Sequence, residues 1–279
     1  MAIDDEVSSA AAGPTQEEVL TVGSLDVEGR LSGASNATLF CIASLGQAQV
    51  ECVYKPVMGE RPLWDFPDGT LGHREVAAYL LAREVAALAD DDQTLIPLTV
   101  WREDGPYGPG SCQLWIEATD TSYVDVVPVD QALPGWLSVL TASDDWGNPL
   151  ELVHRDDHRL RAMALIDIVS NNSDRKGGHI LPTDSDEIYG VDHGLCFNVE
   201  DKLRTVLWGW AGSELHEQEK KLLSKLIERL QSGELRAALS HHLTQEEIDL
   251  TADRAWLLLT QGRFLEPTSR WPSIPWPAF

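Results

Sequence analysis

The segment that says most about the fold is residues 166–181, with the sequence Ile-Asp-Ile-Val-Ser-Asn-Asn-Ser-Asp-Arg-Lys-Gly-Gly-His-Ile-Leu. They join a helix-like segment, residues 158–169, to a short apolar strand. Asn, Ser, Asp and Gly favour turns, so an ordinary helix-to-strand loop is the simplest interpretation. That interpretation does not account for Asp174-Arg175-Lys176 followed at once by two glycines, because so dense a polar cluster is costly to bury.

Two further segments give this loop a chemical context. Lys55 ends an apolar strand, and a helix with Glu75 in its first turn follows. Asp192-His193-Gly194-Leu195 comes after a short strand and shortly after the Asp-Arg loop. Alone, the lysine is often a snorkelling side chain and Asp-x-Gly is usually a turn. In kinases, however, a strand lysine binds phosphates, a helix glutamate holds that lysine and an Asp-x-Gly aspartate binds the metal. The order of the segments predicts a kinase-like nucleotide site.

The hydrophobic pattern divides the chain into a sheet-rich first half and a helix-rich second half. Strands are predicted over residues 25–31, 37–43, 50–55, 96–102 and 112–117, with a helix over 72–89. Beyond residue 119, helices are predicted over 158–169 and 213–230, short strands over 178–181 and 188–192, and a last helix opening at the capping box 244–247. We therefore predict an α+β chain with a two-lobed, protein-kinase-like fold: an antiparallel-sheet N-lobe with one helix, and a mostly helical C-lobe.

The predicted boundaries follow changes in composition. Residues 1–18 are predicted to be a flexible acidic tail, 19–118 the N-lobe and 119–270 the helical C-lobe with the catalytic and metal loops. Residues 271–279, rich in Pro and Trp, cannot form a helix and are expected to dock on the domain surface.

Charge and composition narrow the partners. The chain has 279 residues, with 45 acidic against 21 basic side chains and a formal net charge of −24. Such a chain repels nucleic acid and anionic lipid headgroups, so we expect neither nucleic acid binding nor stable membrane association. No apolar run approaches the roughly 20 residues of a membrane-spanning helix, and the N-terminus does not have the pattern of a signal peptide. A cytoplasmic protein is the expectation.

The four cysteines form no Cys-x-x-Cys pair, so we expect neither a zinc site nor a redox motif. Three of them lie in apolar, strand-like runs, where a reduced cysteine is usually a small buried hydrophobic side chain.

Taken as a set, the motifs resemble the phosphatidylinositol 3-/4-kinase superfamily, and most of all its type II phosphatidylinositol 4-kinase branch. The matching segments are Lys55-Pro56, the hinge-like strand Gln113-Leu114-Trp115-Ile116-Glu117, Asn172-Ser173-Asp174-Arg175 and Asp192-His193-Gly194-Leu195. The resemblance covers roughly residues 27–197. The chain also resembles a bacterial family, mainly actinobacterial, that is described only as kinase-related.

The resemblance implies ATP and Mg²⁺ or Mn²⁺ as cofactors, and it implies a role for each matching residue. Ser35 and Asn36 would lie in the phosphate-covering loop, Lys55 would contact phosphates and Glu75 would orient it. Gln113, Trp115 and Glu117 would surround or bind adenine. Asp174 would take the proton of the acceptor hydroxyl, Arg175 or Lys176 would offset charge on the transferring phosphoryl group, and Asp192 would hold the metal.

One position departs from the family pattern. The catalytic loop of the family usually has an asparagine five residues after the catalytic aspartate, as a second metal ligand, and this chain has His179 there. Imidazole suits Mn²⁺ better than Mg²⁺, which prefers oxygen. Either His179 binds a metal, or Asn171 or Asn172 substitutes for it, or the site is impaired. A simple hydrogen-bonding strand residue is an equally good interpretation of His179.

These observations predict an ATP-dependent phosphotransferase acting on a soluble protein or a small-molecule hydroxyl. Type II lipid kinases carry basic surfaces and a cysteine-rich membrane insertion, and this acidic sequence has neither, so a lipid substrate is disfavoured. Two alternatives stay open: a catalytically weak pseudokinase that acts as a nucleotide-binding regulator, and an AMP transferase.

Overall fold

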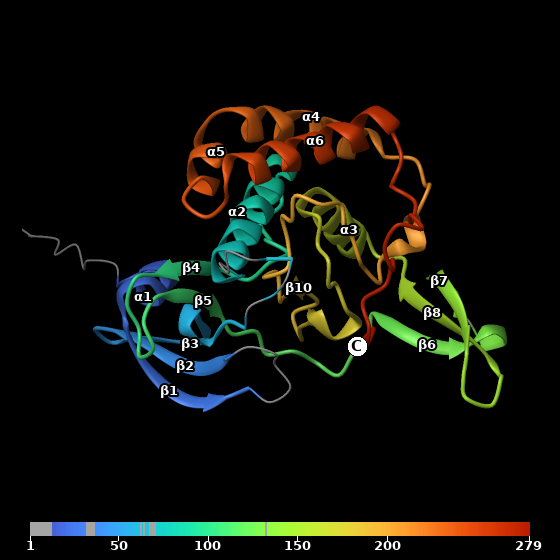
Figure 1. Cartoon of the computed structure of the whole chain (residues 1–279). Coiled ribbons are helices and arrows are strands. Elements are labelled where there is room, and N and C mark those ends of the chain that lie inside the picture. Colours follow the sequence, from blue (N-terminus) through green and yellow to red (C-terminus); the bar gives the residue numbers. More distant parts are fainter. Residues whose placement is uncertain (1–12, 32–36, 62, 64, 67–70, 132) are drawn as a thin grey trace, which may run out of the picture.

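The computed structural model describes residues 13–31, 37–61, 63, 65–66, 71–131 and 133–279. It has an α+β architecture with two lobes: a five-stranded antiparallel sheet built by the first part of the chain, and helices concentrated in the later part (Figure 1). The predicted fold class is therefore confirmed.

The sheet of the first lobe has the strand order β1-β2-β3-β5-β4, with antiparallel neighbours throughout. Its strands are β1 (Ser24–Arg30), β2 (Leu39–Leu45), β3 (Ala48–Pro56), β4 (Thr99–Arg102) and β5 (Gly110–Leu114). Along β2 the side chains of Leu39, Cys41 and Ala43 alternate into a buried core, as period-two spacing requires. Val19 and Leu20 of helix α1 (Gln16–Val22) close that core from outside the sheet.

The long helix α2 (Leu71–Ala89) connects the two lobes. It runs from the first sheet to the helices of the second lobe, α4 and α5 (Figure 1). Small residues such as Ala77 and Ala78 are fully buried together with Leu81, so the helix is packed on most of its circumference. One element therefore spans both cores, and its first turns lie where the lobes meet.

The second lobe combines helices with two small sheets. The helices are α3 (His158–Ser170), α4 (Glu217–Gln231), α5 (Glu234–Leu239) and α6 (Gln245–Gln261). The strands are β6 (Val124–Pro128), β7 (Trp136–Ser143), β8 (Pro149–Arg155), β9 (Ile180–Pro182) and β10 (Ile188–Gly190). Short 3-10 turns lie at Val57–Gly59, Val129–Gln131, Gly177–His179 and Trp208–Trp210. The capping box predicted at Thr244 is present and begins α6.

A three-stranded antiparallel sheet, β6-β8-β7, corrects the sequence analysis, which identified no strand between residues 119 and 157. The sheet lies at the edge of the second lobe, below α3 in Figure 1. Most side chains of β6 and β7 are exposed or half-buried, so their apolar alternation is weak. In β8, the central strand, Leu152, Val153 and His154 are buried in succession, so this strand shows no alternation either.

The N-terminal end of the chain also differs from the expectation. The predicted tail of residues 1–18 overlaps α1, which begins at Gln16 behind a complete Thr15–Glu18 capping box. Residues 1–12 lie outside the described part. The C-terminal segment runs along the second lobe, where Ser273 O accepts hydrogen bonds from Thr205 N and Trp208 Nε1. Ala278 O accepts one from Gly177 N, which places the end of the chain beside the loop of residues 171–179.

The four cysteines are all buried and free. Within the described ranges, no helix combines the length and the apolar character that crossing a bilayer requires.

Arg102 of β4 holds the end of α1 against the sheet through hydrogen bonds. Its guanidinium donates to Leu20 O and Gly23 O and to Asp104 O, and the side chain is almost fully buried. Arg102→Met removes these donors from the buried residues Leu20 and Gly23, so we expect the free energy of unfolding to fall by about 2–4 kcal/mol. Urea denaturation followed by circular dichroism measures it. Arg30→Met, at an exposed position of β1, is the control and should change stability by less than about 0.5 kcal/mol. Equal effects would contradict this role.

Candidate active site

Lys55 lies at the end of β3, where its amine meets one carboxylate from each lobe. Tyr54 points into the first core, and Lys55, the next residue, faces the opposite side. Its Nζ donates to Glu75 Oε1 on α2 at 2.6 Å and to Asp192 Oδ1, after β10, at 2.5 Å. The side chains are 18% exposed for Lys55, 5% for Glu75 and 53% for Asp192. The sequence placed these residues in one site, and the structure brings them into contact.

Lys55, Glu75 and Asp192 form a triad in which opposite charges stabilise one another. Burial opposes the charge on Lys55, but Asp192 and Glu75 outweigh it and raise the pKa of the amine above its usual range. In turn, the Lys55 amine holds the pKa of Asp192 well below its usual range. Both groups are therefore ionised throughout the neutral range. Asp192 also has a positive φ of 61°, an uncommon conformation for a residue other than glycine that is often found at functional sites.

The loop after α3 is built around a buried ion pair between Asp167 and Arg175. Both side chains are fully buried, and Arg175 Nη2 and Nε donate to the Asp167 carboxylate at 2.9 and 3.0 Å. Asn172 Nδ2 and Thr205 Oγ1 donate to the same carboxylate. Because a buried charge needs such partners, Asp167 fixes the loop that carries Asp174. We did not predict this role; the signal in the sequence was an aspartate inside the apolar helix segment Ile166–Ile168.

His193 completes this buried network. Arg175 Nη2 lies 2.6 Å from His193 Nε2, and arginine can only donate, so Nε2 is the acceptor and the ring proton lies on Nδ1. Burial lowers the pKa of His193, so the ring is neutral. The backbone N–H of His193 donates to Glu75 Oε2, and this hydrogen bond links the Asp192-His193-Gly194 segment to α2. The role of His193 is therefore structural.

A cleft of about 380 Å³ lies against the triad. Both lobes line it, and six of the predicted site residues are on its wall: Lys55, Glu75, Asp174, Lys176, His179 and Asp192. Its volume is within the usual range of small-molecule sites, about 300–1,000 Å³. Lys176 Nζ is 3.3 Å from Asp174 Oδ2, so a second cation lies beside the predicted catalytic carboxylate. The cleft thus combines three cations, Lys55, Arg61 and Lys176, with carboxylates from both lobes.

His179 lies on the wall of the cleft beside Asp192, with Nε2 at 3.5 Å from Asp192 Oδ2. Burial lowers the pKa of the imidazole although Asp192 acts in the opposite direction, so the ring is neutral and able to donate a lone pair. The described residues contain no group of three or more His, Cys, Asp or Glu side chains arranged for a metal ion. Oxygen-rich kinase sites, however, hold Mg²⁺ with one or two carboxylates and the phosphates of the nucleotide. The half-exposed Asp192 carboxylate fits that kind of site.

Two predicted site residues have other roles. The expectation that Arg175 offsets charge on a phosphoryl group does not fit its position, because its guanidinium is fully buried against Asp167. The expectation that Asn172 binds metal fails for a similar reason: Nδ2 donates to Asp167, and Oδ1 accepts from Asp174 N. Asn171 is likewise engaged, as the left-handed cap of α3, with both side-chain groups bonded to the backbone of residues 198–202.

Of the remaining predicted residues, Gln113, Trp115 and Glu117 are described and do not line the cleft. Ser35 and Asn36 lie outside the described residues, and Ala37 and Thr38, which follow them, line the cleft. Gln113, in β5, is buried and donates to Thr99 Oγ1. Trp115 and Glu117 follow β5 rather than lie in it, and Trp115 Nε1 donates to Glu117 Oε2 at 3.3 Å. Their contact with adenine stays a prediction.

No family profile matches the chain. Among curated sequences, Protein Rv2133c of Mycobacterium tuberculosis is 46% identical over 274 residues. The match covers 95% of this chain and 95% of the mycobacterial protein, so it extends over both lobes.

The buried Asp167–Arg175 pair predicts a measurable difference between two aspartates of one segment. Asp167→Asn leaves the Arg175 charge buried without a carboxylate, so we expect the free energy of unfolding to fall by about 3–5 kcal/mol. Asp174→Asn is the matched control, because Asp174 is partly exposed and lies on the cleft wall, and it should cost less than about 1 kcal/mol. Urea denaturation of the two variants checks this, and a loss below 1 kcal/mol for Asp167→Asn would rule out the anchoring role.

Proposed function

We propose that this chain, which belongs to the same family as the mycobacterial protein Rv2133c, is an ATP-dependent phosphotransferase of the phosphatidylinositol 3-/4-kinase-like type. The observation that carries the proposal is the contact of Lys55 with both Glu75 and Asp192 beside the cleft. In kinases, a lysine held by a helix glutamate binds the nucleotide phosphates, and an aspartate beside it binds the metal. Because the reaction uses ATP, a cytoplasmic location is part of the proposal.

The proposed reaction assigns a task to each residue of the cleft wall. Lys55 would turn from Asp192 toward the α- and β-phosphates while Glu75 keeps hold of it. Asp192 would hold a divalent metal ion, whose charge would offset that of the β- and γ-phosphates. Asp174 would accept the proton of the acceptor hydroxyl as that oxygen bonds to the γ-phosphorus. The bond between the γ-phosphorus and the bridging oxygen breaks, ADP leaves, and Lys176 would stabilise charge on the transferred group.

The acceptor we propose is a hydroxyl of a soluble protein or a small molecule. The net charge of −24 opposes docking on an anionic membrane surface, which a lipid kinase would need.

A weakly catalytic, nucleotide-binding regulator is the second candidate. It is favoured by one observation, the imidazole of His179 beside Asp192 in place of an oxygen ligand. An AMP transferase is distinguished from both by the phosphate that it transfers.

ATP labelled separately at its α- and γ-phosphates tests the reaction. We expect purified protein, with Mg²⁺ or Mn²⁺, to transfer label from the γ position only, to itself or to an added cell extract. Asp174→Ala and Asp192→Ala should reduce the rate by roughly 100-fold or more, since each removes a charge or proton acceptor needed at the transition state. Asp184→Ala, in an exposed turn, is the control. Label from the α position would indicate AMP transfer, and metal-dependent ATP binding without transfer would favour the regulator.

The metal preference tests His179 separately. His179→Asn supplies an amide oxygen, which Mg²⁺ prefers to an imidazole nitrogen. We expect the ratio of the rates with Mg²⁺ and Mn²⁺ to rise several-fold in this variant. His158→Asn makes the same substitution at an exposed position at the start of α3 and should leave the ratio unchanged. An unchanged ratio in His179→Asn would show that the imidazole is not a metal ligand.

A further inference from the structure

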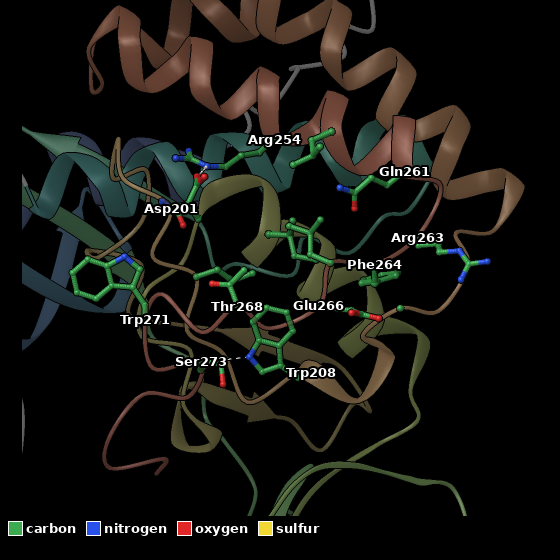
Figure 2. Close-up of a pocket in the computed structure, with 16 residues that line it drawn as sticks. Asp201, Trp208, Arg254, Gln261, Arg263, Phe264, Glu266, Thr268, Trp271 and Ser273 are labelled. Atoms are coloured by element: carbon green, nitrogen blue, oxygen red, sulfur yellow. Dashed lines mark hydrogen bonds and ion pairs between the residues drawn. The ribbon is translucent and has the colours of Figure 1, made fainter.

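The second lobe contains a larger cavity, of about 630 Å³, that shares no lining residue with the cleft around Lys55. It lies between α6 and the C-terminal segment, with the end of α3 and the turn at Trp208 closing it (Figure 2). Its wall is largely apolar and aromatic, built by Ile168, Leu203, Trp208, Leu257, Phe264 and Trp271. A cavity of this volume accommodates a small organic molecule.

Arg254 of α6 is the buried cation of this cavity. The residue is 8% exposed, and two of its three nitrogens are engaged: Nε donates to Asp201 Oδ1 at 3.1 Å and Nη2 to Asn198 O at 2.7 Å. The third nitrogen, Nη1, is buried without a hydrogen-bond partner. A buried guanidinium N–H without an acceptor destabilises the folded state, so an acceptor supplied by a ligand is one explanation for its presence.

The positive charge of Arg254 is only partly neutralised by its surroundings, so a further anion could bind beside it. Its single carboxylate partner, Asp201, is 81% exposed, so solvent screens that pair. Burial lowers the pKa of Arg254, and the nearby Asp201 acts in the opposite direction without offsetting it. The other charged residues of the wall, Arg263 and Glu266, lie at the opposite end of the cavity in Figure 2, and Arg263 pairs with Glu214.

We propose that this cavity binds a small-molecule carboxylic acid with an aromatic or aliphatic body. The carboxylate would accept from Arg254 Nη1, and the body would lie between Trp208, Phe264 and Leu257. The two N–H groups of Nη1 can be shared by one carboxylate, and a monoanion meets less repulsion from the Asp201 carboxylate than a doubly charged phosphate would. The apolar wall supplies the remaining affinity by burying the body.

Matched pairs of probes test this inference without reference to phosphotransfer. Indole-3-acetate and decanoate are titrated into the full-length protein by isothermal calorimetry, each beside its primary amide. We expect saturable binding of at least one acid, with its amide at least roughly tenfold weaker, because a hydrogen bond between two charged groups is the stronger one. Arg254→Met should weaken the acid by roughly 10- to 100-fold. Arg263→Met, at a partly exposed position on the same wall, is the control and should change little.

Two further measurements keep the result interpretable. Circular dichroism establishes whether Arg254→Met folds, since this variant also loses the contacts to Asp201 and Asn198. Leu257→Trp places a bulkier side chain on the cavity wall while residue 254 stays an arginine, and it should abolish binding of the acid. The inference is overturned if neither acid binds the wild type at millimolar concentration, if acid and amide bind equally, or if Leu257→Trp or a folded Arg254→Met binds as the wild type does.

Discussion

The arrangement of the site depends on two contacts of the Lys55 amine. One is with Glu75 of the first lobe and the other is with Asp192 of the second. A lysine that is mostly buried keeps its charge only beside anions, and here the anions come from segments 117 residues apart in the chain. Glu75 acts twice, because its second oxygen accepts from His193 N. The helix α2 therefore positions the lysine and the loop after β10 together, and the cleft forms where these elements meet.

The buried Asp167–Arg175 ion pair positions the loop that carries Asp174. Its members are fully buried, and Asn172, Thr205 and His193 add further hydrogen bonds. A network of this kind favours one arrangement of the loop, because losing either Asp167 or Arg175 leaves a buried charge without its ionic partner. Asp174, Lys176 and His179 can then remain on the wall of the cleft, free of the structural role.

Much of this arrangement was predictable from the sequence, because the signals were local. The apolar pattern of α2 and α3, the capping box of α6 and each of the motifs around Lys55, Glu75, Asp174 and Asp192 are contained in short segments. The sequence could not reveal that Arg175 points inward, since an Asp-Arg-Lys run has no marker for which cation is buried. It also failed for the β6-β8-β7 sheet, whose half-exposed strands alternate weakly. The pairing of Arg254 with Asp201 depends on segments 53 residues apart and was likewise beyond local signals.

The central claim is that the cleft around Lys55 binds nucleotide phosphates. Isothermal calorimetry with a non-hydrolysable ATP analogue and Mg²⁺ tests it directly, on the wild type, Lys55→Met and, as the matched control, Lys225→Met at an exposed position of α4. The account predicts saturable binding that weakens by roughly tenfold or more in Lys55→Met and is unchanged in Lys225→Met. An analogue that does not bind the wild type, or that binds Lys55→Met equally well, would contradict it.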